Sequence, residues 1–114
     1  DLVLAVNVGV TQEDNEVVVV PPDRQFLMTD LVLQNVNGDL GTAQLLRNGD
    51  VLYRWDLGTM NGANDFQPRV TPLPFAPGDN IVLTVACDNT GAESGTGCEI
   101  AALLGGRLVP PPGA

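Results

Sequence analysis

Apolar side chains recur at every second position near the start of the chain. Within residues 2–10, LVLAVNVGV, the side chains that share this face are Leu2, Leu4, Val6, Val8 and Val10. A period of two is typical of a β-strand with one buried face, so we expect an N-terminal strand here. Four consecutive valines follow at residues 17–20, and they predict a second strand because β-branched side chains favour extended backbone. The polar residues 12–15 are expected to form the turn between these two strands.

Turn residues divide the rest of the chain into short segments. Pro21-Pro22 ends the second strand, since proline cannot donate a ladder hydrogen bond. Asn48-Gly49 predicts a two-residue hairpin, because a type I′ turn needs two positive φ angles. Pro77-Gly78-Asp79 predicts a further turn. The segments that we expect to be strands are residues 26–34, 43–47, 51–55, 66–70, 81–87 and 99–108.

The number and spacing of these segments predict the fold class. We expect an all-β protein, a single β-sandwich (jelly-roll or Ig-like) of about seven or eight antiparallel strands. Residues 39–47 also have roughly helical spacing, but the Asn-Gly pair and the strand after it favour the hairpin. The length of 114 residues fits one domain, which we place at residues 1–108. Residues 109–114, VPPPGA, are expected to form a proline-rich tail.

Acidic residues dominate the charge. The 14 Asp and Glu residues outnumber the 5 Lys and Arg residues, which gives a net charge of −9. Binding to nucleic acids or to anionic membranes rests on clustered basic side chains, so we expect neither partner. No apolar run approaches the length of about 18 residues that predicts a membrane span, so no membrane insertion is expected.

The residues needed for most enzyme mechanisms are missing. The chain has no histidine and no lysine, which excludes an imidazole base, a Schiff base and a P-loop. Its single serine, Ser94, lies in a glycine-rich segment with no such base to activate it. Two cysteines cannot form a four-ligand zinc site. We therefore predict that the protein is not an enzyme and that it needs no cofactor, with calcium as the one alternative.

Cys87 ends one predicted strand and Cys98 stands at the start of the next, and ten residues with three glycines separate them. We predict a disulfide that closes this loop. The alternative is a redox-active pair, but the spacing is not Cys-X-X-Cys and no histidine or lysine is present to lower a thiol pKa. A disulfide indicates an oxidising compartment, so we expect an extracellular location or one on a cell or virion surface.

Acidic and amide side chains in the loops suggest calcium as a ligand. Asp88, Asn89 and Glu93 supply the hard oxygen atoms that calcium prefers. Two further groups of this kind are Glu13, Asp14 and Glu16, and Asp79 with Asn80. None of the three matches an EF-hand loop. The alternative is that these residues form turns, for which Asp and Asn have backbone reasons.

Two aromatic residues raise the question of sugar binding. Tyr53 and Trp55 are two positions apart, so they lie on the same face of one predicted strand. Exposed, they would form a stacking platform for carbohydrate; buried, they would fill the sandwich. The chain has only five aromatic residues, one Trp, one Tyr and three Phe, so the core interpretation is favoured.

Apolar residues exceed what one buried face per strand requires. Residues 17–20, 31–33, 81–83 and 101–104 are apolar on both faces, and the second face needs a cover. Another copy of the protein is one such cover, and an N-terminal strand can add to the sheet of a neighbour. An ordinary edge strand that covers its own core is the alternative. The predicted assembly interface is Leu2, Leu4, Val6, Val8, Val10, Val17, Val18, Val19 and Val20.

Three stretches carry a resemblance to a known group of proteins. They are RQFLMTDLVLQN, GTAQLLRNGDVLYRW and FAPGDNIVLTVAC, which lie within residues 20–108. Together they resemble small secreted bacterial proteins with a jelly-roll-like sandwich, which are mostly uncharacterised. The resemblance implies the fold and secretion, and it implies no catalytic residue.

These observations lead to one favoured function and one alternative. The favoured function is a non-catalytic extracellular structural module that self-assembles, as a filament, surface-layer or virion subunit. Its partners would be copies of itself, in an oligomer or polymer joined by addition of the N-terminal strand. The alternative is a β-sandwich module that binds carbohydrate or calcium. Light scattering separates the two, because only the first requires a large assembly without ligand.

Overall fold

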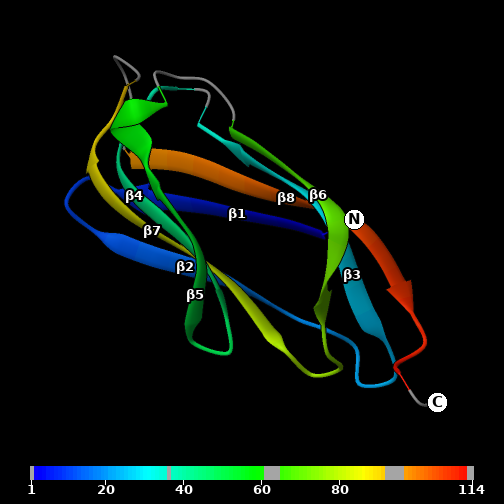
Figure 1. Ribbon diagram of the computed structural model, residues 1–114. Helices are drawn as coiled ribbons and strands as arrows, with labels where there is room; N and C mark the ends of the chain where they lie inside the picture. Colours follow the sequence, from blue (N-terminus) through cyan, green and yellow to red (C-terminus); the bar gives the residue numbers. More distant parts are fainter. Residues whose placement is uncertain (1, 36, 61–64, 92–96, 113–114) are drawn as a thin grey trace.

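The computed structural model is a sandwich of two β-sheets (Figure 1). The structure describes residues 2–35, 37–60, 65–91 and 97–112, with the backbone alone for residues 66–70. The strands are β1 (Leu2–Gly9), β2 (Glu13–Val19), β3 (Gln25–Gln34), β4 (Leu40–Arg47), β5 (Asp50–Asp56), β6 (Asp65–Phe75), β7 (Asn80–Asn89) and β8 (Gly97–Val109). A short 3₁₀ turn, η1 (Leu57–Thr59), follows β5. The described residues contain no helix with the length and hydropathy needed to cross a bilayer.

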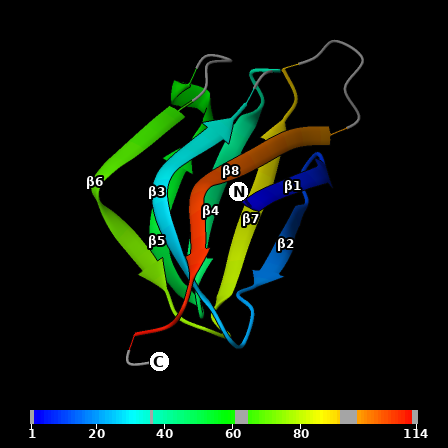
Figure 2. The same cartoon turned by 90° about the vertical axis from the view of Figure 1, so that its right-hand side faces the viewer.

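The strand order identifies the type of sandwich. One sheet, here called sheet A, has the order β1-β8-β3-β6, and the other, sheet B, has the order β2-β7-β4-β5. The pairs β1–β8, β2–β7, β3–β6 and β4–β5 are all antiparallel, and each pair is nested inside the previous one along the chain. Figure 2 shows the two sheets from a second side. Eight strands in two sheets of this order form a jelly roll. The predicted all-β sandwich is confirmed, in its jelly-roll form.

Several strand boundaries differ from those predicted. The polar residues 13–16 belong to β2 rather than to a turn, because β2 is an edge strand and needs few apolar side chains. β6 continues to Phe75 through Pro72 and Pro74, which an edge strand tolerates since one row of its N–H groups has no ladder partner. Residues 40–47 are extended throughout, so the helical alternative for this segment is excluded.

The core lies between the sheets and takes every second side chain from most strands. β1 contributes Leu4, Val6 and Val8, each at most 6% exposed. Phe26 of β3 and Phe75 of β6 are in ring contact, with centroids 6.2 Å apart. Further buried residues from both sheets complete this cluster: Met28, Leu31, Leu33, Ala43, Leu45, Leu57, Ile81, Leu83, Val85, Ile100, Ala102 and Leu104. The alternation predicted for residues 2–10 is therefore the alternation of a core strand.

Most residues of the predicted assembly interface are not on the surface of the single chain. Leu4, Val6, Val8 and Val20 are buried in the protein's own core, and Leu2 and Val18 pack against it. Only the side chains of Val10, Val17 and Val19 are exposed among the nine. β1 pairs with β8 of the same chain along its whole length, so it is an edge strand that covers its own core. The physical reason is that alternating apolar residues show that one face of a strand is buried. They do not show whether the same chain or another copy covers that face.

The sheet edges are protected against pairing with another strand. In β1 the backbone N–H of Ala5 donates a hydrogen bond to the Glu16 carboxylate, at 3.0 Å. β6 contains three prolines, Pro68, Pro72 and Pro74, which cannot donate. The edge strands of sheet B carry the charged residues Glu13, Asp14 and Glu16 in β2 and Asp50, Arg54 and Asp56 in β5. Proline and charge at edges are the usual devices that prevent strand addition.

The surplus apolar residues form one row on the outer face of each sheet. The strand registers align Val17, Val82, Leu46 and Val51 across sheet B. In sheet A they align Val3, Leu103 and Val32, which we call the apolar ridge. Leu103 and Val32 are half-buried, whereas Val3 is 56% exposed. The second apolar faces predicted from the sequence are thus partly shielded by neighbours in the same sheet.

The Asn48-Gly49 hairpin is confirmed. The two residues have φ angles of 52° and 88°, as a type I′ turn requires, and they join β4 to β5. The Asn48 side chain also donates to Asp79 Oδ1 at 2.9 Å and accepts from the Asn80 N–H at 2.8 Å. The hairpin is therefore bound to the turn that precedes β7.

Replacing Gly49 by valine is expected to destabilise the protein by about 1–3 kcal/mol, because a β-branched residue resists positive φ. A Cβ atom at Gly49 would have nothing within 4 Å, so the loss is backbone strain rather than collision. Urea denaturation measures it. Gly49→Asn is the matched control, since asparagine tolerates the left-handed conformation. Equal losses for the two variants would contradict this explanation.

Candidate functional site

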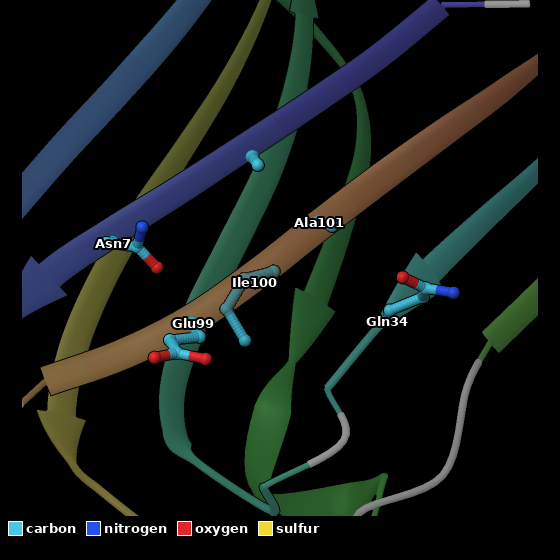
Figure 3. A pocket seen from close by; sticks show the side chains of 6 residues that line it. Asn7, Gln34, Glu99, Ile100 and Ala101 are labelled. Atoms are coloured by element: carbon cyan, nitrogen blue, oxygen red, sulfur yellow. The ribbon is translucent and has the colours of Figure 1, made fainter. Parts of the chain in front are cut away.

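A hollow on the outer face of sheet A brings together polar side chains from three neighbouring strands (Figure 3). It has a volume of about 230 Å³. We call it the amide hollow, and its lining residues are Ala5, Asn7, Gln34, Glu99, Ile100 and Ala101. None of its polar residues was among the sites predicted from the sequence. They occupy the solvent-facing positions of alternating strands, where a polar side chain is the ordinary choice, so the pattern alone gives no signal.

Strand register shapes the amide hollow. Asn7 of β1 lies opposite Glu99 of β8, and Ala101 lies between Ala5 and Gln34 in the next row of the sheet. Directly opposed Cβ atoms are about 4.5–5.5 Å apart and diagonal ones about 7–8 Å, so these polar groups lie within reach of one small molecule. The two alanines are short, and they leave the floor of the hollow open and apolar. Figure 3 shows Asn7, Glu99 and Gln34 on three different strands around Ala101.

The polar groups of the amide hollow offer both donors and acceptors. The amides of Asn7 and Gln34 each present an NH₂ donor and a carbonyl acceptor, whereas the carboxylate of Glu99 accepts. Within the described part of the chain, these three side chains make no hydrogen bond to another protein group. Among the residues that the structure describes, no basic side chain lines the hollow. The arrangement therefore suits a neutral ligand with several hydroxyl groups and one apolar face.

A buried carboxylate holds the backbone of Glu99 in place. Asp39, in the connection from β3 to β4, is fully buried. Its Oδ2 accepts a hydrogen bond from the Glu99 N–H and its Oδ1 accepts one from the Gly91 N–H, both at 2.9 Å. These bonds hold Gly91, just after the end of β7, and Glu99, near the start of β8. Asp39 is thus a positioning residue for the amide hollow.

Asn35 in turn orients Asp39. Its Oδ1 accepts from the Asp39 N–H at 2.9 Å, and its Nδ2 donates to the carbonyl oxygens of Asp39, at 3.1 Å, and Leu57, at 3.3 Å. Asn35 is also fully buried. The sequence does not reveal these roles, because a buried Asn or Asp in a connection has the same local pattern as an exposed one.

Cys87 and Cys98 are joined by a disulfide, as predicted. Their Cα atoms are 5.8 Å apart, and both side chains are buried. The bond links the end of β7 in sheet B to the start of β8 in sheet A, next to Glu99. Residues 92–96 of the loop that it closes lie outside the described residues.

The predicted calcium ligands are only partly brought together. Asp88 and Asn89 are exposed at the end of β7, and Glu93 lies outside the described residues. Asp88 and Glu13 line one hollow of about 370 Å³. The described residues contain no group of three or more acidic, cysteine or histidine side chains that could hold a metal ion. Calcium binding at Asp88, Asn89 and Glu93 stays a prediction.

The other two calcium candidates have structural roles instead. Asp79 accepts from the Ala76 N–H at 2.8 Å and from Asn48, so it stabilises the turn before β7. Asp14 accepts from the Asn15 N–H and Glu16 from the Ala5 N–H. The turn interpretation given from the sequence therefore accounts for Asp79, and hydrogen bonds to backbone N–H groups account for Asp14 and Glu16.

Tyr53 and Trp55 do not form an exposed sugar platform. Their rings stack on each other, with centroids 5.8 Å apart and planes 15° from parallel. Trp55 is 7% exposed and its Nε1 donates to Asp65 Oδ2 at 2.6 Å, while Tyr53 is half-buried against the core. A ring that is buried and stacked has no free face for a sugar. The core interpretation holds.

Comparisons with known families, curated proteins and solved structures gave the following results. No protein-family model matches the chain. No curated protein matches it either. A solved structure of a family 35 carbohydrate binding module from an environmental isolate is similar with a TM-score of 0.47 and 13% sequence identity, covering 90% of this chain and 72% of that one. Nothing in the comparisons supports the resemblance to small secreted bacterial proteins in particular.

Proposed function

We propose that the protein is a non-catalytic binding module that recognises neutral carbohydrate through the amide hollow. One observation carries the proposal: three polar side chains from three strands surround an alanine floor and have no hydrogen-bond partner within the described part of the protein. The disulfide supports an extracellular location, since such bonds persist in oxidising compartments.

The electrostatics of the chain favour a neutral ligand over an acidic one. The described residues that line the amide hollow include one carboxylate and no basic side chain. The net charge of −9 repels polyanions at long range. Sugar hydroxyls both donate and accept, which matches the mixed groups of Asn7, Gln34 and Glu99. The floor formed by Ala5 and Ala101 suits the apolar face of a sugar ring.

The rigidity of the site supports the same function. Each polar side chain comes from a strand within the sheet rather than from a loop, and the backbone at Glu99 is held by Asp39. A backbone that is already in position needs no ordering when a ligand binds, so only the side chains lose conformational entropy. The volume of about 230 Å³ is below the range of about 300–1,000 Å³ typical of drug-sized ligands, so the hollow fits one sugar unit rather than a whole chain.

Self-assembly through β1 is not part of this proposal. It requires the apolar face of β1, which is buried in the protein's own core, and an open strand edge, which Glu16 covers at Ala5. The net charge of −9 also opposes contact between copies.

Titration with cellohexaose, xylohexaose and mannohexaose tests the proposal. We expect at least one of them to bind, with nuclear magnetic resonance shift changes concentrated at Asn7, Gln34 and Glu99. Glu99→Ala should weaken that binding about 10- to 100-fold, because a hydrogen bond to a charged group contributes about 1.5–3 kcal/mol.

Gln44→Ala is the matched control for these titrations. Gln44 is half-buried like Gln34 but belongs to β4 of sheet B, so its replacement should leave the affinity unchanged. Absence of binding to all three hexasaccharides at millimolar concentration would contradict the proposal. Equal losses for Glu99→Ala and Gln44→Ala would contradict the assignment of the site.

A further inference from the structure

We propose that the bound carbohydrate is a linear chain that continues from the amide hollow along β3 and β8 to a second subsite. This inference rests on the proposed function and adds the length of the ligand and a new set of contacts. The second subsite is a hollow of about 310 Å³, which we call the bulge hollow. Its lining residues are Thr29, Asp30, Gly105, Gly106 and Arg107.

A β-bulge creates the bulge hollow. The register of β3 shifts between Met28 and Asp30 in its pairing with both β8 and β6. An extra residue in one strand bends it and directs side chains differently from the regular alternation. Thr29 Oγ1 lies 3.1 Å from Asp30 Oδ1 and 3.3 Å from the Gly105 carbonyl oxygen, so it anchors the carboxylate against β8.

Two glycines of β8 let groups of β3 approach its backbone closely at the bulge hollow. A Cβ atom at Gly105 would collide with the Asp30 carboxylate, and one at Gly106 would collide with the carbonyl oxygen of Leu27. The carboxylate of Asp30 therefore lies directly over the backbone of β8. Glycine in a strand costs stability, and it is often found where another group approaches the backbone closely.

The side chains of the bulge hollow complement a pair of neighbouring hydroxyl groups. Asp30 presents a half-buried carboxylate as acceptor, and Arg107 presents an exposed guanidinium with five donors. No ion pair joins these two residues to each other, and no protein group is bonded to the Arg107 side chain, within the described part of the chain. The carboxylate and the guanidinium are both planar, and each can form two hydrogen bonds to a pair of adjacent hydroxyl groups.

The two hollows lie on the same face of the same pair of strands. Outward positions on β8 run from Glu99 and Ala101 through Leu103 to Gly105, while those on β3 run from Gln34 through Val32 to Asp30. Figure 2 shows β3 and β8 side by side along this whole course. The centres of the hollows are about six residues apart on β8, which corresponds to about 20 Å at about 3.3 Å per residue.

The apolar ridge lies between the two hollows and completes a continuous path. Leu103 is opposite Val3 on one side and Val32 on the other. An apolar row flanked by polar hollows matches a chain of sugar units, in which apolar ring faces alternate with hydroxyl groups. A single chain that spans both hollows gains the second contact without a second loss of translational freedom, and for this reason we infer one long ligand rather than two short ones.

A length series of oligosaccharides tests the inference. The probes are the cello-, xylo- or manno-oligosaccharides of the series that binds, from the disaccharide to the hexasaccharide. We expect affinity to rise with length. Asp30→Ala and Arg107→Ala should each weaken hexasaccharide binding about tenfold and leave disaccharide binding unchanged, whereas Glu99→Ala should weaken both.

The control and the contrary outcomes separate the two proposals. Arg107 is exposed, so its replacement should not affect folding, and Arg54→Ala on the outer face of sheet B is its matched control. If the disaccharide binds as tightly as the hexasaccharide and Arg107→Ala has no effect, the second subsite is wrong and the proposed function stands. If no member of the series binds, both are wrong.

Discussion

Replacing Asp39 by alanine is expected to destabilise the protein by about 3 kcal/mol. The substitution removes both acceptors of the Gly91 and Glu99 N–H groups, and hydrogen bonds to charged groups contribute about 1.5–3 kcal/mol each. That is a large part of the stability of about 5–15 kcal/mol that proteins typically have. Urea denaturation measures the loss, and hydrogen exchange at the Gly91 and Glu99 amides should accelerate.

Asp23→Ala is the control for this experiment. Asp23 is exposed between β2 and β3, so its replacement should change the free energy of unfolding by less than about 0.5 kcal/mol. If Asp39→Ala and Asp23→Ala are equally mild, Asp39 does not hold the segment after β7. A stable Asp39→Ala protein that still binds the hexasaccharide normally would show that Glu99 is positioned by other contacts.

Loss of the disulfide is expected to have a comparable effect. Cys87 and Cys98 are 11 positions apart, and closure of a loop of this size is expected to contribute about 2–4 kcal/mol. The double variant Cys87→Ser, Cys98→Ser should therefore unfold at a lower urea concentration than the oxidised protein. Both cysteines are buried, so the variant is a cleaner test than reductant added to the folded protein.

Two observations check the interpretation of this variant. Reductant added to the unfolded wild-type protein before refolding should lower its urea midpoint toward that of the double variant and leave the variant unaffected. Alkylation of two thiols in protein purified without reductant would show that the bond is absent. An unchanged midpoint in the double variant would show that the bond contributes nothing to stability.

The elements determined by local sequence were predictable. The Asn48-Gly49 turn depends on the backbone preferences of two residues, and the structure has the expected φ angles there. The Cys87–Cys98 pairing followed from the presence of only two cysteines, and the core position of Trp55 from the scarcity of aromatic residues. In each case the decisive information lies within one short segment or in the composition of the chain.

Features that depend on strand register could not be predicted. Alternation in residues 2–10 identified a buried face correctly but not its partner, which is the protein's own sheet B across the core. Asn7, Gln34 and Glu99 are far apart in the sequence, and only the β1–β8–β3 register brings them together. The bulge at Asp30 could not be predicted either, because one extra residue hardly changes the composition of a long strand.

Side chains on β1, β3 and β8 alternate between the core and the outer face of sheet A. Inward residues such as Val6, Leu33 and Ile100 form the core, while their outward neighbours Asn7, Gln34 and Glu99 line the amide hollow. Exposed positions tolerate replacement with changes usually within about 0.5 kcal/mol. Substitutions on the outer face of sheet A can therefore change the chemistry of that surface while the core stays constant.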